Sequence, residues 1–276
     1  MEFVDFRLKL WTKSVELFFP GWQKGEKVAF LSPHDDDVLL GAAYLLLATR
    51  EAGGVPLILI YCQGDAGYSH VEEKETIVFT RRKETVEAYG KLGVREEEIF
   101  YFNIPDFSLA PYINRRLQDK EGLFEEQLKL FRQHQVSRVI FSSGFYEHWD
   151  HTAVFYMGVY TSPQAGDPIL ADLGPPWAPK SYYAYSVWGD FEPEPGADQE
   201  ELRADKGILV EEDQEALVRE AIQAFASQKE IFQSIVAYRE KRKSEFGYLE
   251  LYKTIPIRKQ IDYSRYFQHL ARWKKT

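Results

Sequence analysis

Two short clusters of histidine and aspartate are the part of the sequence best suited to chemistry. Residues 32–37 read Ser-Pro-His-Asp-Asp-Asp, residues 147–151 read Glu-His-Trp-Asp-His, and together they hold three of the six histidines. Imidazole and carboxylate groups are ligands for zinc and other divalent metals, and a catalytic zinc keeps one position open for water. The two clusters therefore indicate a metal-dependent hydrolytic site.

The spacing within the clusters suggests a ligand set. His34 and Asp37 are three residues apart, which lets both reach one ion from a turn between a strand and a helix. His151 would complete a His-Asp-His set, and Asp36 would lie beside the metal without binding it, as a general base should. The absence of a thiolate in either cluster favours a mononuclear hydrolytic site. As an alternative, the three consecutive aspartates only cap a helix and favour its dipole.

Four apolar segments that alternate with helical patterns must position these clusters. The expected strands are Lys27–Leu31, Pro56–Tyr61, Ile99–Phe102 and Arg138–Ser142, and the expected helices are Val38–Arg50, Glu72–Leu92 and Leu123–His134. Uniformly apolar strands are typical of a parallel sheet buried on both faces, and the alternation with helices predicts βαβ crossovers. We therefore expect an α/β fold: a Rossmann-like, mostly parallel sheet with helices on both faces.

The loops that follow these strands should lie at one rim of the sheet, because ligands of such folds bind beyond the carboxyl ends of the strands. The loops concerned are 32–37, 63–70, 103–108 and 143–151. Both histidine clusters fall within this set. Their joint placement favours a metal site over simple helix capping.

The second half of the chain has a looser pattern. Pro163–Pro179 is rich in proline and glycine and predicts a long loop or lid, whereas Tyr182–Trp188 fits a further strand. Glu211–Lys243 predicts a long amphipathic helix whose acidic start and basic end agree with the helix dipole. Without a repeat or a linker, we expect one domain over residues 1–276 with a C-terminal helical extension from about residue 211.

Five motifs occur in order along residues 27 to about 230. They are SPHDDDVLLG with EHWDH about 110 residues later, QGDAG at 63–67, RRKE at 81–84, Ile104-Pro105-Asp106, and Ser227-Gln228. This order resembles the LmbE/PIG-L family of zinc-dependent N-acetylglucosaminyl deacetylases. That family is marked by Ala-His-Pro-Asp-Asp-Glu and a later His-Pro-Asp-His.

The resemblance implies catalytic roles by position. His34, Asp37 and His151 match the zinc ligands of the family. Asp36 matches the base that deprotonates the attacking water. His148 matches the histidine that stabilises the oxyanion or protonates the leaving amine, and Asp150 matches the carboxylate that orients that histidine.

Three residues are candidates for contact with a substrate. Arg81 and Asp106 match positions at which the family lines its substrate pocket. Trp149 lies inside the second cluster, and sugars often stack on aromatic faces, so we expect it to line a sugar subsite.

The chain departs from the family pattern at three positions. Asp35 replaces the usual proline, Val38 replaces the usual glutamate, and Phe225 stands where a histidine commonly precedes Ser-Gln. None of these departures removes a proposed ligand or the base. They bear on the branch of the family and therefore on the substrate.

Composition limits the class of protein. The 43 acidic residues outnumber the 34 basic ones, giving a net charge of −9, which argues against a nucleic-acid partner. A single cysteine, Cys62, excludes an internal disulfide. The first twenty residues carry charges unlike a secretory signal, and the longest apolar-rich run, Val38–Ala48, is shorter than the roughly 20 residues of a membrane span. We therefore expect a cytoplasmic protein without a membrane span.

These observations favour a zinc-dependent amidohydrolase, with another divalent metal as a variant. It would remove an N-acetyl or N-acyl group from a small-molecule amino sugar or its conjugate, and the sequence is compatible with an oligomer. One alternative is a metal-dependent hydrolase of another bond, such as a phosphoester. Another is a non-catalytic sugar- or nucleotide-binding α/β protein, although no Gly-x-Gly-x-x-Gly of a dinucleotide module follows the first strand.

Overall fold

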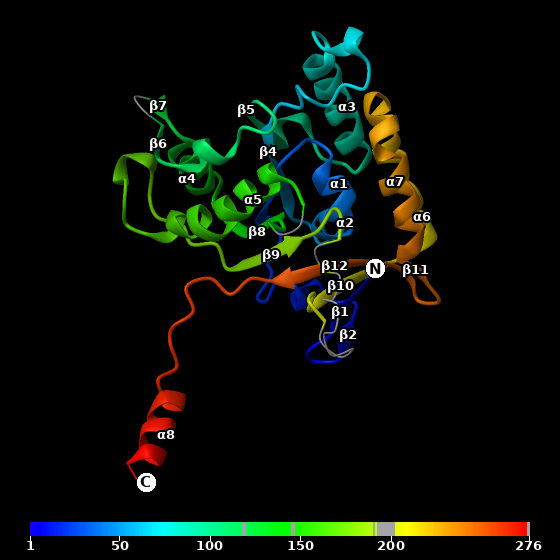
Figure 1. Ribbon diagram of the computed structural model, residues 1–276. Helices are drawn as coiled ribbons and strands as arrows, with labels where there is room; N and C mark the ends of the chain where they lie inside the picture. Colours follow the sequence, from blue (N-terminus) through cyan, green and yellow to red (C-terminus); the bar gives the residue numbers. More distant parts are fainter. Residues whose placement is uncertain (118–119, 145–146, 190, 192–201, 275–276) are drawn as a thin grey trace.

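A mixed ten-stranded sheet runs through the molecule (Figure 1). The computed structural model describes residues 1–276 except 118–119, 145–146, 190, 192–201 and 275–276. The strand order is β2-β1-β10-β12-β9-β8-β3-β4-β5, with β11 paired to β12, and a separate two-stranded sheet is made by β6 and β7. The strands are β1 (Glu2–Asp5), β2 (Leu10–Thr12), β3 (Lys27–Ser32), β4 (Val55–Cys62), β5 (Ile99–Ile104), β6 (Arg116–Leu117), β7 (Lys120–Glu121), β8 (Val136–Ser142), β9 (Ser181–Tyr185), β10 (Lys206–Val210), β11 (Lys243–Ser244) and β12 (Gly247–Thr254).

The centre of the sheet is parallel and confirms the predicted fold class. Strands β9, β8, β3, β4 and β5 pair in parallel, in that order. Each of the four predicted strands forms, longer by one or two residues, as β3, β4, β5 and β8. Of the strand predicted at Tyr182–Trp188, only the first part forms, as β9, which ends at Tyr185. Their uniformly apolar character follows from burial on both faces of the sheet.

The other half of the sheet is antiparallel and was not predicted. Strand β12 pairs with β9 and β10, and β1 pairs with β10 and β2, all antiparallel. Along β12 buried residues alternate with half-buried ones, which is the pattern of a strand with one face in the core. The sequence of β12, GYLELYKT, is interrupted by Glu and Lys and is therefore a weaker signal than the continuous apolar runs of the parallel strands.

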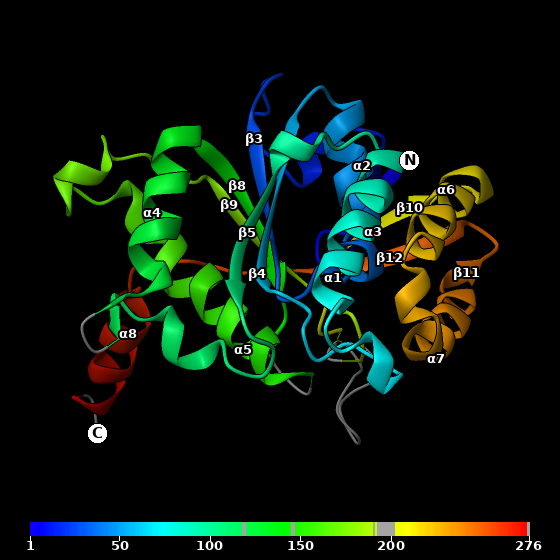
Figure 2. The same ribbon diagram turned by 90° about the horizontal axis from the view of Figure 1, so that it is seen from above.

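Helices cover both faces of the sheet, as expected (Figure 2). They are α1 (Asp37–Gly41), α2 (Ala43–Glu51), α3 (Ile77–Lys91), α4 (Leu123–His134), α5 (Trp149–Tyr156), α6 (Glu212–Gln223), α7 (Lys229–Arg239) and α8 (Ser264–Trp273). Successive residues of β3 point to opposite faces: Val28 and Phe30 join the core under α1, α2, α3 and α6, and Ala29 and Leu31 join the core under α4 and α5.

Two predicted helices are interrupted. The first breaks at Ala42 between α1 and α2, where the backbone leaves helical geometry (φ −140°, ψ 20°). The neighbouring Gly41 is packed tightly, since a Cβ there would lie 2.5 Å from the ring of Tyr185. The second breaks at Phe225, between α6 and α7. A single domain over the whole chain stays a prediction.

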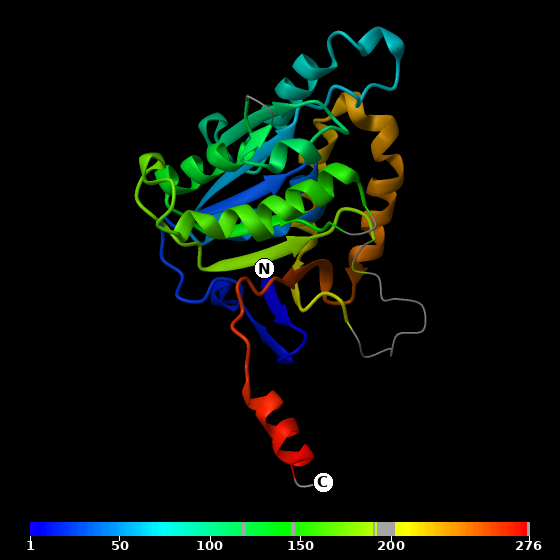
Figure 3. The same cartoon turned by 60° about the vertical axis from the view of Figure 1, so that its left-hand side comes forward.

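Segments outside the central elements complete the chain. The proline-rich stretch contains two short 3-10 turns, Ser162–Gly166 and Ala171–Leu173, within an otherwise irregular segment. Helix α8 stands apart from the rest of the molecule at the end of an extended segment (Figures 1 and 3). In the described part of the chain, no helix combines the length and apolar character that crossing a bilayer requires.

Candidate metal centre

A cavity of about 210 Å³ opens at the carboxyl ends of the parallel strands. Its lining includes residues from the loops after all five parallel strands, β3, β4, β5, β8 and β9, and from α7. This confirms the shared rim that the sequence predicts. The cavity lies where the chain order switches, because β4 and β5 extend the sheet on one side of β3 and β8 extends it on the other.

The structure brings the three predicted ligands together at this rim. His34 lies in the turn after β3, Asp37 begins α1, and His151 lies in the first turns of α5. One possible ligand atom from each lies within 4.8 Å of the others. The Nδ1 atom of His34 is 3.2 Å from Oδ2 of Asp37, and Nε2 of His151 is 3.3 Å from Oδ1 of the same carboxylate.

Each of the two imidazoles is held on its far side by a second carboxylate. Nε2 of His34 lies 3.4 Å from Oδ2 of Asp150, and Nδ1 of His151 lies 2.7 Å from Oε2 of Glu147. When the two imidazoles are neutral, the ring nitrogens that face Asp37 are therefore the ones that keep a lone pair for a metal. Carboxylates that fix the tautomer of metal-binding histidines are a common second layer of metal sites. Glu147 belongs to the second cluster, but its position in the sequence does not predict this contact.

We expect Glu147→Gln to weaken metal binding by about 10–100-fold. Oε1 of Glu147 accepts hydrogen bonds from Ser186 Oγ at 2.6 Å and from the backbone N–H groups of Val187 and Trp188 at 3.0 Å. These three donors would retain the carbonyl oxygen of a glutamine, so its NH₂ group would face Nδ1 of His151. The imidazole would then carry its proton on Nε2, the nitrogen that faces Asp37.

Competition with a chromophoric zinc chelator measures this change. Glu87→Gln serves as the matched control, because the Glu87 side chain is 64% exposed on α3. Equal zinc affinity for Glu147→Gln and the unaltered protein would show that the carboxylate does not set the tautomer.

Electrostatics in the ligand cluster favour a cation. Burial opposes a charge on Asp37, but His151 and His34 outweigh it and lower the pKa of Asp37 well below its usual value. Burial alone would lower the pKa of His151. The carboxylates of Asp37 and Glu147 outweigh this effect and raise the pKa of His151 to about 9. Positive charge is thus stabilised at the point where the three side chains meet.

Asp36 lies beside the ligands and lines the same cavity. Burial raises the pKa of Asp36 to about 7, although the Arg81 guanidinium opposes the shift, and the two neighbouring aspartates add to it. Asp36 is the N-cap residue of α1 but its side chain makes no capping hydrogen bond. Helix capping therefore does not account for this carboxylate.

Arg81 is turned toward the aspartates rather than left free for a substrate. Its guanidinium donates to both carboxylate oxygens of Asp35 and, at 3.1 Å, to Oδ2 of Asp36. A third nitrogen donates to Oε1 of Gln228 at 3.2 Å. Arg81 does line the cavity, but its side chain is only 4% exposed. Asp35, the residue that replaces the family proline, thus holds the arginine next to Asp36.

His148 lines the cavity, and Asp150, which contacts it, is buried outside the lining. Nδ1 of His148 accepts the backbone N–H of Asp150 at 3.1 Å, which places the imidazole proton on Nε2. Burial and the nearby His34 lower the pKa of His148. The Asp150 carboxylate approaches both His34 and His148, at 3.4 and 3.5 Å. It also accepts the backbone N–H groups of Phe107 and Leu109.

The three predicted substrate contacts have different positions. Asp106 lines the cavity, where its carboxylate accepts the N–H groups of Gly64 and Ala66 and so shapes the loop after β4. Trp149 is 75% exposed and does not belong to the cavity lining, whereas Trp188 does. Tyr146, a further aromatic residue directly before the second cluster, lies outside the described residues.

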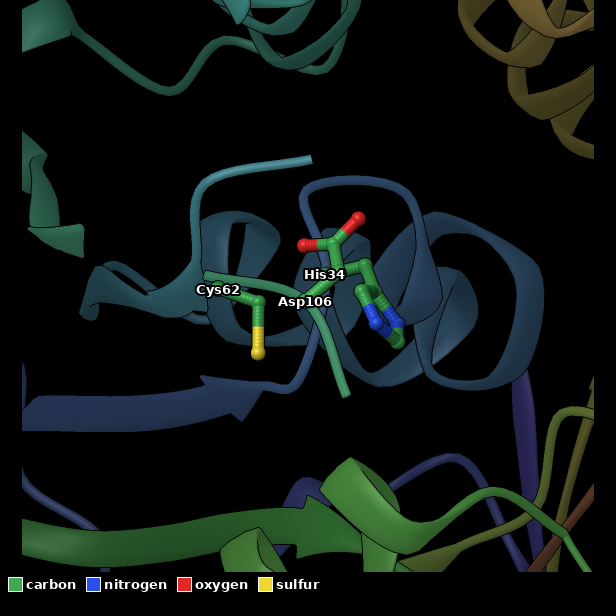
Figure 4. Close-up of side chains that lie close together, drawn as sticks. All are labelled: His34, Cys62 and Asp106. Atoms are coloured by element: carbon green, nitrogen blue, oxygen red, sulfur yellow. The ribbon is translucent and has the colours of Figure 1, made fainter. Parts of the chain in front are cut away.

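Two other groups of side chains around His34 have metal-ligand spacing. One joins His34 to Cys62 and Asp106, side by side in Figure 4, and the other joins it to His148 and Asp150. Burial raises the pKa of the Cys62 thiol, and the nearby Asp150 and Asp106 add to the shift, so the sulfur keeps its proton. The His34, Asp37 and His151 group fits a divalent cation better, since backing carboxylates orient both of its imidazoles.

Fold and site together define an α/β protein with a candidate metal centre at the carboxyl ends of its central strands. Residues 29–161 match the model of the PIG-L family, described as GlcNAc-PI de-N-acetylase. The chain therefore carries a PIG-L (LmbE-like) family domain over these residues, which confirms the resemblance noted in the sequence. That description is of a hydrolytic deacetylase. The comparison with curated proteins found no match.

Solved structures with the same fold include enzymes of more than one kind. N,N'-diacetylchitobiose deacetylase from Pyrococcus horikoshii is 18% identical, with a TM-score of 0.67 and coverage of 88% of each chain. The 4-carboxy-2-hydroxymuconate hydratase from Pseudomonas putida KT2440 is 19% identical, with a TM-score of 0.62 and coverage of 86% of this chain and 99% of the other. A triple mutant of a deacetylase of the teicoplanin biosynthetic pathway is 14% identical, with a TM-score of 0.61 and coverage of 83% and 97%. At these identities the likeness concerns the fold.

Proposed function

We propose that the protein is a zinc-dependent hydrolase that removes an N-acetyl or other N-acyl group from an amino sugar or its conjugate. The observation that carries this proposal is the convergence of His34, Asp37 and His151 within 4.8 Å, beside Asp36, in one cavity. The description of the matched family and the deacetylases among its structural relatives support the choice of an amide bond.

The proposed ligands fit zinc in both number and kind. Two imidazoles and one carboxylate are three protein ligands, the number that a catalytic zinc site uses. When bound, zinc acts as a Lewis acid that polarises a carbonyl and lowers the pKa of water. Another divalent metal with the same ligand preference would supply the same chemistry.

Asp36 and His148 then have different roles: Asp36 accepts a proton from water, and His148 donates a hydrogen bond to the substrate. Asp36 takes the proton of the attacking water, since it lines the cavity next to the ligands and its pKa is raised to about 7. His148 donates its Nε2–H to the negative charge that develops on the substrate carbonyl oxygen. Loss of one donor of this kind typically costs about 10²–10³ in rate. The leaving amine receives a proton from Asp36 or from His148.

The mouth of the cavity suits an amino sugar that carries an apolar group. Trp188 is half exposed at this mouth and offers a face for a sugar ring, so we assign sugar stacking to it rather than to Trp149. Ile231, Phe232 and Ile235 of α7 form an apolar wall beside it. An apolar substituent of a conjugated sugar would contact this wall.

Release of amine and acetate from N-acetylglucosamine conjugates tests the function. We expect zinc-loaded protein to release the two products in equal amounts, and chelator-treated protein to release neither until zinc is restored. Phosphate monoesters, incubated in parallel, test the phosphoesterase alternative. Zinc-loaded protein that binds a sugar conjugate without turnover, or that releases only phosphate, would contradict a deacetylase.

A further inference from the structure

Helix α8 carries an apolar face that the described part of the chain does not cover. Tyr263, Tyr266, Phe267 and Leu270 follow the spacing of one helix face and are between 53% and 63% exposed. Every residue from 258 to 274 is exposed. A helix of ten residues is marginal in water on its own, because packing of an apolar face supplies most helical stability. The sequence of α8 is therefore that of a docking element.

The arm, which comprises the chain from residue 258 onward and includes α8, starts at a fixed point on the body, residues 1–257. Ile255 and Ile257 pack against the core under α4 and α5. Arg258 then forms a bidentate ion pair with Asp167, in which its two terminal guanidinium nitrogens lie 2.6 and 2.7 Å from the two carboxylate oxygens. The chain leaves the surface after this point, and Figures 1 and 3 show α8 standing away from the body. The arm thus starts from a defined place and direction.

Charge is divided unevenly between the arm and the body. The last 19 residues contain six basic side chains and one acidic one, a net charge of +5. Because the whole chain carries −9, the remaining 257 residues carry −14. The acidic body of another copy of the chain therefore offers the basic arm a partner of opposite charge, and an anionic lipid surface is the alternative partner.

A matching apolar patch lies on the body. Leu10, Trp11 and Phe246 are between 46% and 61% exposed, and the rings of Trp11 and Phe246 meet edge to face at 5.5 Å. Carboxylates adjoin the patch, since Glu2 accepts the indole N–H of Trp11 and Glu245 precedes Phe246. The hairpin of β1 and β2 that carries Trp11 lies on the same side of the molecule as α8 (Figures 1 and 3).

We propose that α8 is an exchanged arm whose apolar face packs on the patch of Leu10, Trp11 and Phe246 in a second copy of this chain. The arm of the second copy packs in the same way on the patch of the first copy, as two-fold symmetry requires. Each of the four side chains on the α8 face has about 100 Å² left to bury, so one arm covers about 400 Å². Two arms and two patches then bury on the order of 1,600 Å², the size of a standard stable interface. This inference does not depend on the proposed function.

Molar mass by light scattering, measured on the full chain, tests the exchange. We expect the unaltered protein to have twice the chain mass of 32.2 kDa. Phe267→Ser/Leu270→Ser on the arm and Phe246→Ser on the patch should each give 32.2 kDa, while circular dichroism shows that both remain folded. Gln268→Ser, on the opposite face of α8, is the matched control and should remain a dimer.

Three results would overturn the exchange. They are a monomeric unaltered protein, an unchanged mass for the arm variant, and an unchanged mass for the patch variant. Sedimentation with phosphatidylserine vesicles checks the lipid alternative. A monomer that binds these vesicles, and loses binding in Phe267→Ser/Leu270→Ser, would assign α8 to a membrane surface instead.

Discussion

Asp36→Asn should lower the rate of amide hydrolysis by about 10²–10⁴-fold while zinc content stays at one equivalent. Asparagine keeps the shape of the side chain but cannot accept the proton of the attacking water. Asp36 belongs to no group of side chains with metal-ligand spacing in the described residues, so zinc should remain. Steady-state amine release measures the rate, and elemental analysis of the same sample measures the zinc.

Two comparisons separate loss of the base from other effects of Asp36→Asn. Asp172→Asn removes an exposed carboxylate in a distant 3-10 turn and should leave both zinc content and rate unchanged. Asp35→Asn breaks the other carboxylate pair of Arg81 and tests whether that pairing alone carries the effect. A fully active Asp36→Asn would remove Asp36 from the mechanism, and a zinc-free one would make it a metal ligand.

The central fold was predictable because strands buried on both faces of a sheet have continuous apolar sequences. Runs such as PLILIY at 56–61 have no polar residue to place on a solvent face, so only a strand covered on both sides fits them. The helix at 123–134 was predicted with its observed bounds. The antiparallel strands escaped prediction because β1, for example, has only four residues, Glu-Phe-Val-Asp, without a continuous apolar run, and pairs with β10, some 200 residues away.

The candidate ligands were predictable for a related reason. His34 and Asp37 follow one buried strand directly, and His151 lies nine residues after the next strand of the rim, so parallel topology alone brings them to one edge. The same logic placed Asp36 and His148 in the cavity. Whether these residues act as ligands and catalytic groups stays a prediction that the variants test.

The supporting contacts could not be predicted, because they depend on side-chain direction. Glu147 joins His151 to the backbone after β9, about 40 positions further along the chain. The Arg81 guanidinium donates to both Asp35 and Asp36 instead of being left free for a substrate. Nothing in the spacing distinguishes these partners from solvated charges. The replacement of the family proline by Asp35 was the one available signal of a new contact for Arg81.

His151→Ala should abolish stoichiometric zinc binding and with it all measurable turnover. The variant removes one of three proposed ligands, so zinc affinity should fall further than the about 10–100-fold expected for loss of a backing carboxylate. It also leaves Asp37 and the fully buried Glu147 without the imidazole that lies between them. His70→Ala is the matched control, because His70 is 61% exposed and outside the cavity lining. Added imidazole should restore part of the zinc binding to His151→Ala but not change His70→Ala. If His151→Ala instead holds zinc as tightly as the unaltered protein, the ion binds elsewhere and the proposed centre is wrong.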